Sequence, residues 1–186
     1  MNFKSLTLAL AATLTLGAAQ AQSLNLTPES STVLEGTAFS LSVTGKDFAT
    51  ALMGGGFGLS FDPSVLTLNS VVIPAAWEFA PQGGLIDSAS GTLSDAAFTT
   101  FAAPKAGDFL AATLNFTAKG PGTTTVQLAP SSTFVFTDVD VNPVNPRFGS
   151  ALVTVSAVPE PSTYALVLAG MGVAAVARRR RNTPQA

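Results

Sequence analysis

The chain has 186 residues, of which 47% are hydrophobic and 11% charged, and it contains neither histidine nor cysteine. The lack of both residue types excludes a Ser-His-Asp triad, a thiol nucleophile and disulfides, and it removes the main ligands of zinc. Between Gln22 and Val158 stand ten acidic and four basic residues. This acidic excess argues against nucleic acid binding, which needs clustered cations. We therefore expect a protein that is not an enzyme and that binds no nucleic acid.

Residues 1–21 have the three parts of a signal peptide. Lys4 supplies the positive charge, residues 6–18 form an apolar run, and Ala19-Gln20-Ala21 is a small-x-small cleavage site. We expect cleavage before Gln22 and export of the remaining chain through the inner membrane. Residues 22–157 would then form the exported domain.

Within residues 22–157, apolar side chains recur at every second position in several short segments. Such alternation places one face of a β-strand on a core. The apolar positions are Leu24 and Leu26, then Phe39, Leu41 and Val43, then Phe57, Leu59 and Phe61, then Leu114 and Phe116, then Val126 and Leu128, then Phe134 and Phe136, and finally residues 152–155.

Clusters of glycine, proline, asparagine and aspartate separate these segments and predict turns. Three of the predicted turns are residues 44–47, 54–56 and 106–108. At Asp62-Pro63, the carboxylate is expected to accept backbone hydrogen bonds while the proline presets the turn. No long stretch has helical spacing. The pattern predicts an all-β domain, an antiparallel β-sandwich of jelly-roll type with two sheets packed face to face.

Three stretches resemble the cohesins and related carbohydrate-binding sandwiches of cellulosome scaffolds. They are residues 36–43 (GTAFSLSV), residues 56–66 (GFGLSFDPSVL) and residues 112–126 (ATLNFTAKGPGTTTV). The resemblance covers most of residues 23–155 and implies a cohesin-like fold. Cohesins bind dockerins through one sheet face, but no partner-binding residue can be matched in this chain.

Alternating acids at Asp138 and Asp140 resemble the start of a calcium loop. The glycine that such a loop needs is missing, and Pro143 follows instead. A strand with Val139 and Val141 inward and the acids outward accounts for the same residues. We therefore expect no cofactor and no metal, with weak structural calcium at Asp138 and Asp140 as the alternative.

The single tryptophan, Trp77, lies in a loop-like segment between predicted strands. An exposed indole there would be a possible ligand contact, stacking on a sugar or filling a partner's pocket. Burial as a lid over one end of the sandwich is the alternative. Phe98 and Phe101 would point to opposite faces of a strand, which leaves one of them exposed.

The tail, residues 158–186, combines a stiff proline segment, an apolar run and a basic cluster. Residues 164–177 carry no charge and predict a single transmembrane helix. At 1.5 Å per residue this run covers about 21 Å of a hydrocarbon core of about 30 Å, so the membrane anchor is expected to be marginal. The positive-inside bias places the arginines in the cytoplasm. They are Arg178, Arg179, Arg180 and Arg181.

The tail resembles the PEP-CTERM sorting signal of Gram-negative bacteria. The motif residues are Pro159, Glu160 and Pro161, and the hydrophobic helix and basic cluster follow in the same order. The resemblance implies recognition by an exosortase, a membrane transpeptidase for which these residues would be substrate. The protein would then reside in the cell envelope, at the cell surface or outside the cell.

Two functions fit this organisation. In the first, the sandwich binds another exported protein or an extracellular polysaccharide. In the second, it is a structural component of the extracellular matrix or biofilm without a specific ligand. Saturable binding to a surface component would distinguish the first from the second.

Overall fold

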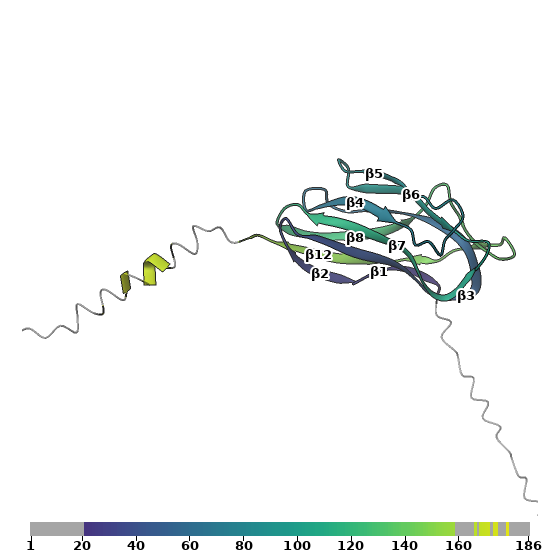
Figure 1. The fold of residues 1–186 in the computed structure, drawn as a ribbon, viewed down its shortest axis with the longest axis horizontal. Coiled ribbons are helices and arrows are strands. Elements are labelled where there is room, and N and C mark those ends of the chain that lie inside the picture. The colour runs from purple at the N-terminus through teal and green to yellow at the C-terminus, as the bar shows by residue number, and fades with distance from the viewer. Residues whose placement is uncertain (1–20, 159–165, 167, 172, 175–177, 179–186) are drawn as a thin grey trace, which may run out of the picture.

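The computed structural model describes residues 21–158 and, in the tail, residues 166, 168–171, 173, 174 and 178 (Figure 1). The described domain contains strands and turns, which confirms the all-β prediction. In chain order the strands are β1 (Ser23–Thr27), β2 (Ser30–Leu34), β3 (Ala38–Ser60), β4 (Leu66–Val72), β5 (Leu85–Asp87), β6 (Thr92–Thr99), β7 (Lys105–Ala118), β8 (Gly122–Pro130), β9 (Phe136–Asp138), β10 (Pro143–Val144), β11 (Arg147–Phe148) and β12 (Ser150–Ser156).

The long strand β3 joins the two layers of the sandwich. Its first part pairs with β7 on one side and β1 on the other, which gives a first layer in the order β4-β7-β3-β1-β11. Its second part pairs with β6 on one side and with β8 and β9 on the other. The second layer therefore runs β5-β6-β3-β8-β12-β2. Because β3 is continuous, the two layers share one hydrogen-bonded network.

Two strand pairs differ from the antiparallel expectation. β1 pairs with β11 in parallel, and β12 pairs with β2 in parallel, whereas the other described pairs are antiparallel. The chain passes from β1 in one layer directly to β2 in the other. β2 thus lies at the margin of the second layer, beside the last strand of the domain (Figure 1).

Most of the alternating apolar residues fill the space between the layers, as predicted, but Leu152 is 48% exposed. Leu24, Leu41 and Leu114 are fully buried, and Phe116 packs between Phe39 and Phe61. A second aromatic group closes the end of the sandwich opposite Glu35. Its members are Phe48, Trp77, Phe98, Phe109 and Phe136.

Three predicted turns are wrong, because residues 44–47, 54–56 and 106–108 all lie inside strands. The first and third face each other across the bulged part of the β3–β7 pair, where the register shifts. At residues 54–56 the glycines bring the strand against its neighbours. A Cβ on Gly55 would lie 2.5 Å from the ring of Phe136. These glycines allow close packing instead of chain reversal.

The Asp62 turn agrees with the prediction. Its Oδ1 accepts hydrogen bonds from the Ser64 backbone N–H at 2.8 Å and the Ser64 hydroxyl at 2.6 Å. These bonds hold the pKa of the Asp62 carboxyl below its usual value. Leu66 and Leu68 follow in the core at the start of β4. Asp62 therefore has a structural role.

Most of the two predicted targeting segments lies outside the described residues, including residues 1–20 and the motif at 159–161. The described tail positions, 166, 168–171, 173, 174 and 178, are helical. Within the described ranges no helix has the length and apolarity needed to cross a membrane. The signal peptide and the transmembrane helix remain predictions.

Candidate functional site

A shallow depression lies on the outer face of the second layer, where β6, β3 and β8 run side by side. It has a volume of about 290 Å³. Its floor is Gly58 of β3, which pairs with Ala129 of β8. The exposed Ser94 of β6 and Ser60 of β3 stand beside this floor. Small side chains on three neighbouring strands therefore create the hollow.

A β-bulge in β6 shapes one wall. The register between β3 and β6 shifts between Phe57 and Leu59, so that both Ser94 and Asp95 lie opposite Gly58. A Cβ on Gly58 would lie 2.8 Å from the carbonyl oxygen of Leu93, closer than real Cβ atoms approach. The bulge thus requires glycine at position 58 and turns Asp95 toward the loop after β8.

Asp95 holds that loop against the sheet. Its Oδ1 accepts hydrogen bonds from the Ser131 hydroxyl at 2.5 Å and the Ser132 backbone N–H at 3.1 Å. Its Oδ2 accepts one from the Thr133 hydroxyl at 3.2 Å. The bond from Ser131, assisted by Thr133 and Ser132, keeps the pKa of Asp95 below its usual value. Asp95 is therefore an ionised clamp whose oxygens are already occupied.

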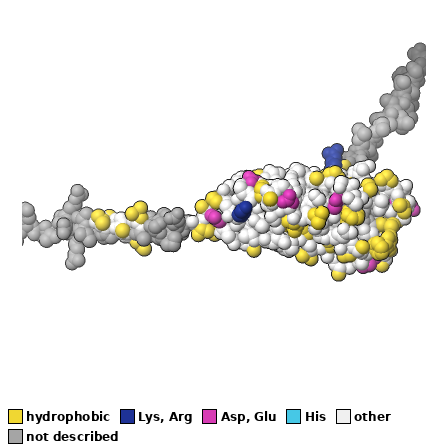
Figure 2. Space-filling view, turned by 90° about the horizontal axis from the view of Figure 1, so that it is seen from above, with side chains coloured by type: hydrophobic (Ala, Val, Ile, Leu, Met, Phe, Trp, Pro, Cys, Tyr) yellow, Lys and Arg dark blue, Asp and Glu magenta, His cyan; other side chains and the backbone are white. Residues whose placement is uncertain are grey.

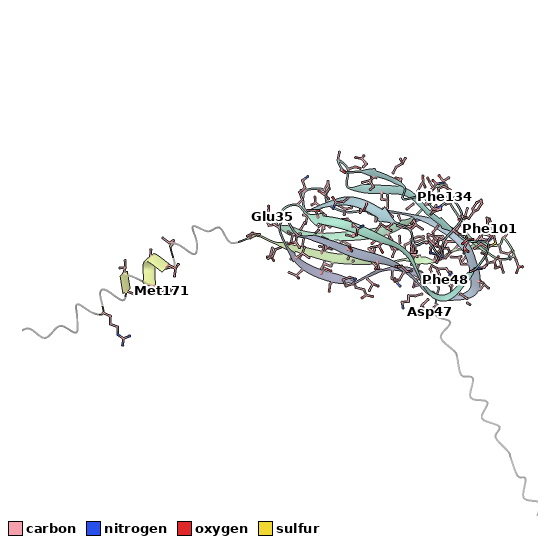
Figure 3. All side chains as sticks on the ribbon, viewed as in Figure 1. Glu35, Asp47, Phe48, Phe101, Phe134 and Met171 are labelled. Carbon is pink, nitrogen blue, oxygen red and sulfur yellow. The ribbon has the colours of Figure 1, made fainter. Side chains whose placement is uncertain are left out.

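Two further hollows adjoin the depression around the same loop. One, of about 300 Å³, is lined mainly by apolar residues, among them Phe134, Phe136 and Phe148. The other, of about 470 Å³, lies between residues 82–85 and Phe134. Figure 3 places Phe134 at the end of the domain away from Glu35. The loop 131–134 therefore separates a polar hollow from a more apolar one.

The chemistry of the depression favours binding over catalysis. Among its lining residues Asp95 alone is ionisable, and a glycosidase would need two carboxylates across a cleft. The serine and threonine hydroxyls can form hydrogen bonds with a partner. The floor carries no charge, so covering it does not remove a charged group from water.

An exposed aromatic pair lies at the same end of the domain. Phe79 and Phe101 are 53% and 55% exposed, and their ring centroids are 4.6 Å apart in an edge-to-face arrangement. Glu78 fixes the loop, because its Oε1 accepts backbone N–H bonds from Phe101 and Ala102. A hydrogen bond from Thr100 and these N–H bonds lower the pKa of Glu78 to about 2. Figure 2 shows hydrophobic side chains gathered at this end.

Trp77 is buried, so it does not provide the possible ligand contact. The indole is 1% exposed, and its Nε1–H donates a hydrogen bond of 2.8 Å to the carbonyl oxygen of Leu110. Phe98 and Phe109 pack against it edge to face. Trp77 closes the core at this end, and the exposed member of the Phe98 and Phe101 pair is Phe101.

The predicted orientation at Asp138 is wrong. Asp138 is 8% exposed, whereas Val139 and Val141 are 46% and 69% exposed. β9 ends at Asp138, whose Oδ1 accepts backbone N–H bonds from Asn142 at 2.8 Å and Asp140 at 3.0 Å. The bonds from Asn142 keep the pKa of Asp138 below its usual value. The carboxylate therefore stabilises a tight turn. Because the chain turns after Asp138, residues 139–141 do not continue the expected strand.

Gly58, Asp95 and Phe79 were not predicted as site residues from the sequence. The bulge opposite Gly58 depends on how β6 pairs with β3, a contact between residues far apart in the chain. The spacing Gly54, Gly55, Gly56 and Gly58 was a signal, because glycine inside an alternating strand marks a bulge or a close approach. Nothing in the sequence pairs Phe79 with Phe101.

Comparison with known proteins identifies the tail. The profile of the PEP-CTERM protein-sorting motif matches residues 157–181. The tail is a PEP-CTERM sorting signal. It contains the predicted motif residues Pro159, Glu160 and Pro161 and the four arginines, of which Arg178 is at a described, helical position. The PEP-CTERM signal indicates a secreted protein of the envelope or cell surface.

Solved structures identify the fold of the domain as that of cohesins. A cohesin in the Coh-OlpA-Doc918 cohesin–dockerin complex from Clostridium thermocellum is 11% identical, with a TM-score of 0.61, and the match covers 73% of this chain and 99% of that one. A non-cellulosomal cohesin from Archaeoglobus fulgidus is 12% identical, with a TM-score of 0.59 and coverage of 78% and 96%. CaCohA2 from Clostridium acetobutylicum is 18% identical, with a TM-score of 0.57 and coverage of 73% and 92%. No curated protein matches. The PEP-CTERM chain therefore carries a cohesin fold.

Proposed function

We propose that the chain is an exported, non-catalytic surface protein whose cohesin-like domain binds another protein through the β6–β3–β8 face. The main support is the depression at Gly58, whose lining is uncharged apart from Asp95 and which opens on an exposed sheet face. The fold adds support, since one of the similar solved structures is a cohesin in complex with a dockerin. The proposed partner is a protein whose polar groups form hydrogen bonds with the hydroxyls of Ser60 and Ser94.

The placement of the tail fits such a role. The Glu35 N–H donates to the Ser156 carbonyl oxygen, so the chain leaves the domain at the end where Glu35 lies. Phe101 and Phe134 lie at the other end (Figure 3). A domain tethered through its PEP-CTERM tail would present this end away from the membrane.

Arginine at position 94 is expected to abolish protein binding at this face. Its side chain would obstruct the depression of about 290 Å³ and add a positive charge to a face that presents hydroxyls to the partner. The matched control is Ser40→Arg, which makes the same change at an exposed position on the outer face of the first layer. Proteins exported by the same organism are passed over the immobilised full-length chain, and saturable retention is measured. Equal retention by the two variants would contradict the proposal.

Polysaccharide binding is the second candidate, favoured by the exposed pair Phe79 and Phe101. Aromatic rings present apolar faces on which sugar rings stack. In the same assay, retention of the organism's exopolysaccharide that is lost in Phe101→Ala but kept in Ser94→Arg would support this candidate. Retention of neither material by the unmodified chain would instead favour a structural role in the matrix.

We further propose that an exosortase cleaves the tail near Pro159. The mass of the protein isolated from cells is expected to correspond to a chain that begins at Gln22 and lacks the residues beyond the proline segment. Replacing Pro159, Glu160 and Pro161 together by alanine is expected to prevent this loss, because the motif is the enzyme's substrate. A mass that includes Ala186 in the unmodified protein would contradict cleavage.

A further inference from the structure

The outer edge of β2 differs from the other sheet edges in the described domain. β5 is three residues long, and β4 has a bulge between Leu68 and Ser70. β2 pairs with β12 alone, over five consecutive residues and without a register shift. It contains no proline, lysine or bulge, the features that usually protect an edge strand.

The hydrogen bonds to β12 show which backbone groups of β2 are free. Leu152 N–H donates to the Glu29 carbonyl oxygen at 2.8 Å, and Glu35 N–H donates to that of Ser156 at 2.9 Å. In the parallel register of this pair, Ser31 and Val33 complete the bonds to β12. Successive residues of a strand direct their N–H and C=O groups to opposite sides. Ser30, Thr32 and Leu34 therefore direct theirs to the outer edge.

Most of these outward groups are without a partner in the described part of the chain. The Leu34 carbonyl oxygen accepts a bond from Thr37 N–H at 3.1 Å. The N–H and C=O of Ser30 and Thr32 and the N–H of Leu34 remain available. The side chains of Ser30, Thr32 and Leu34 are exposed as well. The edge is a row of alternating donors and acceptors that another strand can pair with.

Charge defines the kind of strand that fits. Glu29 and Glu35 are exposed at the two ends of β2, and the five residues between them are uncharged. Within the described ranges the one ion pair is Lys46–Asp108, so neither glutamate is neutralised. A strand of seven residues spans about 20 Å between its end residues. Two like charges separated in this way attract an extended segment with a basic residue at each end.

We propose that the outer edge of β2 binds an extended segment of a partner protein, which adds an antiparallel strand and places basic residues opposite Glu29 and Glu35. A second copy of this chain fits less well. Antiparallel pairing of β2 with itself about Thr32 would set Glu29 opposite Glu35, and like charges opposite each other destabilise a pair. This site is separate from the Gly58 depression, because β12 lies between β2 and β8, the strand of the depression nearest to β2.

The test uses the purified full-length chain and the synthetic peptide acetyl-Lys-Thr-Val-Thr-Val-Thr-Lys-amide. Hydrogen exchange is measured by NMR. At saturation the amides of Ser30, Thr32 and Leu34 are expected to exchange at about one tenth of their rate without peptide, or more slowly still, because newly hydrogen-bonded amides are protected. Those of Ser31 and Val33, already bonded to β12, are expected to change little. Unchanged exchange at the three outward amides would overturn the proposal.

Two variants make the test specific. Thr32→Pro removes an outward N–H while leaving the bonds to β12, so it is expected to fold and to lose peptide binding. Thr32→Val is its control, since it keeps the N–H. Glu29→Lys with Glu35→Lys is expected to weaken binding of the lysine peptide about tenfold and to favour a peptide with glutamate at both ends.

Peptide binding by folded Thr32→Pro equal to that of the unmodified chain would overturn the proposal, as would self-association of the chain in place of peptide binding. Ser94→Arg is expected to leave peptide binding unchanged. Failure of protein binding at the Gly58 depression is therefore distinguishable from failure at β2.

Discussion

Alanine at position 77 is expected to lower the free energy of unfolding by about 3–5 kcal/mol, as large-to-small substitutions of buried aromatic residues do. Trp77 is 1% exposed and contacts Phe98 and Phe109, so its removal leaves a cavity that neighbouring rings cannot fill. The Leu110 carbonyl oxygen also loses the indole hydrogen bond. Denaturant unfolding followed by circular dichroism measures the difference.

Leu152→Ala is the control for this change, because Leu152 is 48% exposed and its truncation is expected to alter the free energy of unfolding by less than about 1 kcal/mol. The chain has a single tryptophan, so its fluorescence reports the environment of Trp77 directly. Strong quenching of that fluorescence by acrylamide in the folded protein would contradict burial. So would a Trp77→Ala variant as stable as the unmodified chain.

Alternation predicted the strands well, because a strand with one face on a core must place apolar residues at every second position. Leu24 and Leu26, Leu41 and Val43, and Val126 and Leu128 are buried as this rule requires. The same rule failed at residues 138–141. There the pattern is two acids and two valines, and the Asp138 carboxylate gains more from bonding the turn's N–H groups than from water.

Turn residues predicted the Asp62 turn but not the glycines inside β3. Glycine is frequent in turns because it accepts positive φ, and it is also used where a side chain would collide. Gly54, Gly55 and Gly56 belong to the second kind, since none of them has positive φ and each faces a neighbour. Only the position of the neighbouring strands and loops distinguishes the two uses.

The candidate site was less predictable than the fold. The depression depends on Gly58, the bulge at Asp95 and the loop at Ser131, which are brought together by pairing across the sheet. The sequence could not predict whether Trp77 is exposed, because a large side chain in a loop is exposed or buried according to what packs over it. The tail was predictable, because its signal consists of consecutive residues and needs no tertiary contact.

Valine at position 55 is expected to lower the free energy of unfolding by about 3 kcal/mol, the upper part of the range for overpacking a core. The Cβ at this position would lie 2.5 Å from Cγ of Phe136, at the base of the ring. Moving the ring away from position 55 would disturb its packing against Phe48, Phe98 and Phe148. Denaturant unfolding again measures the change.

Ala129→Val is the matched control for Gly55→Val. It adds the same kind of side chain to a strand of the same layer at an exposed position, and its effect is expected to be below about 1 kcal/mol. Combining Gly55→Val with Phe136→Leu is expected to recover about 0.5–3 kcal/mol relative to the sum of the single changes, since the collision partner is removed. Strict additivity would show that Gly55 does not face Phe136. Gly55 would then serve another purpose than close packing against Phe136 of β9.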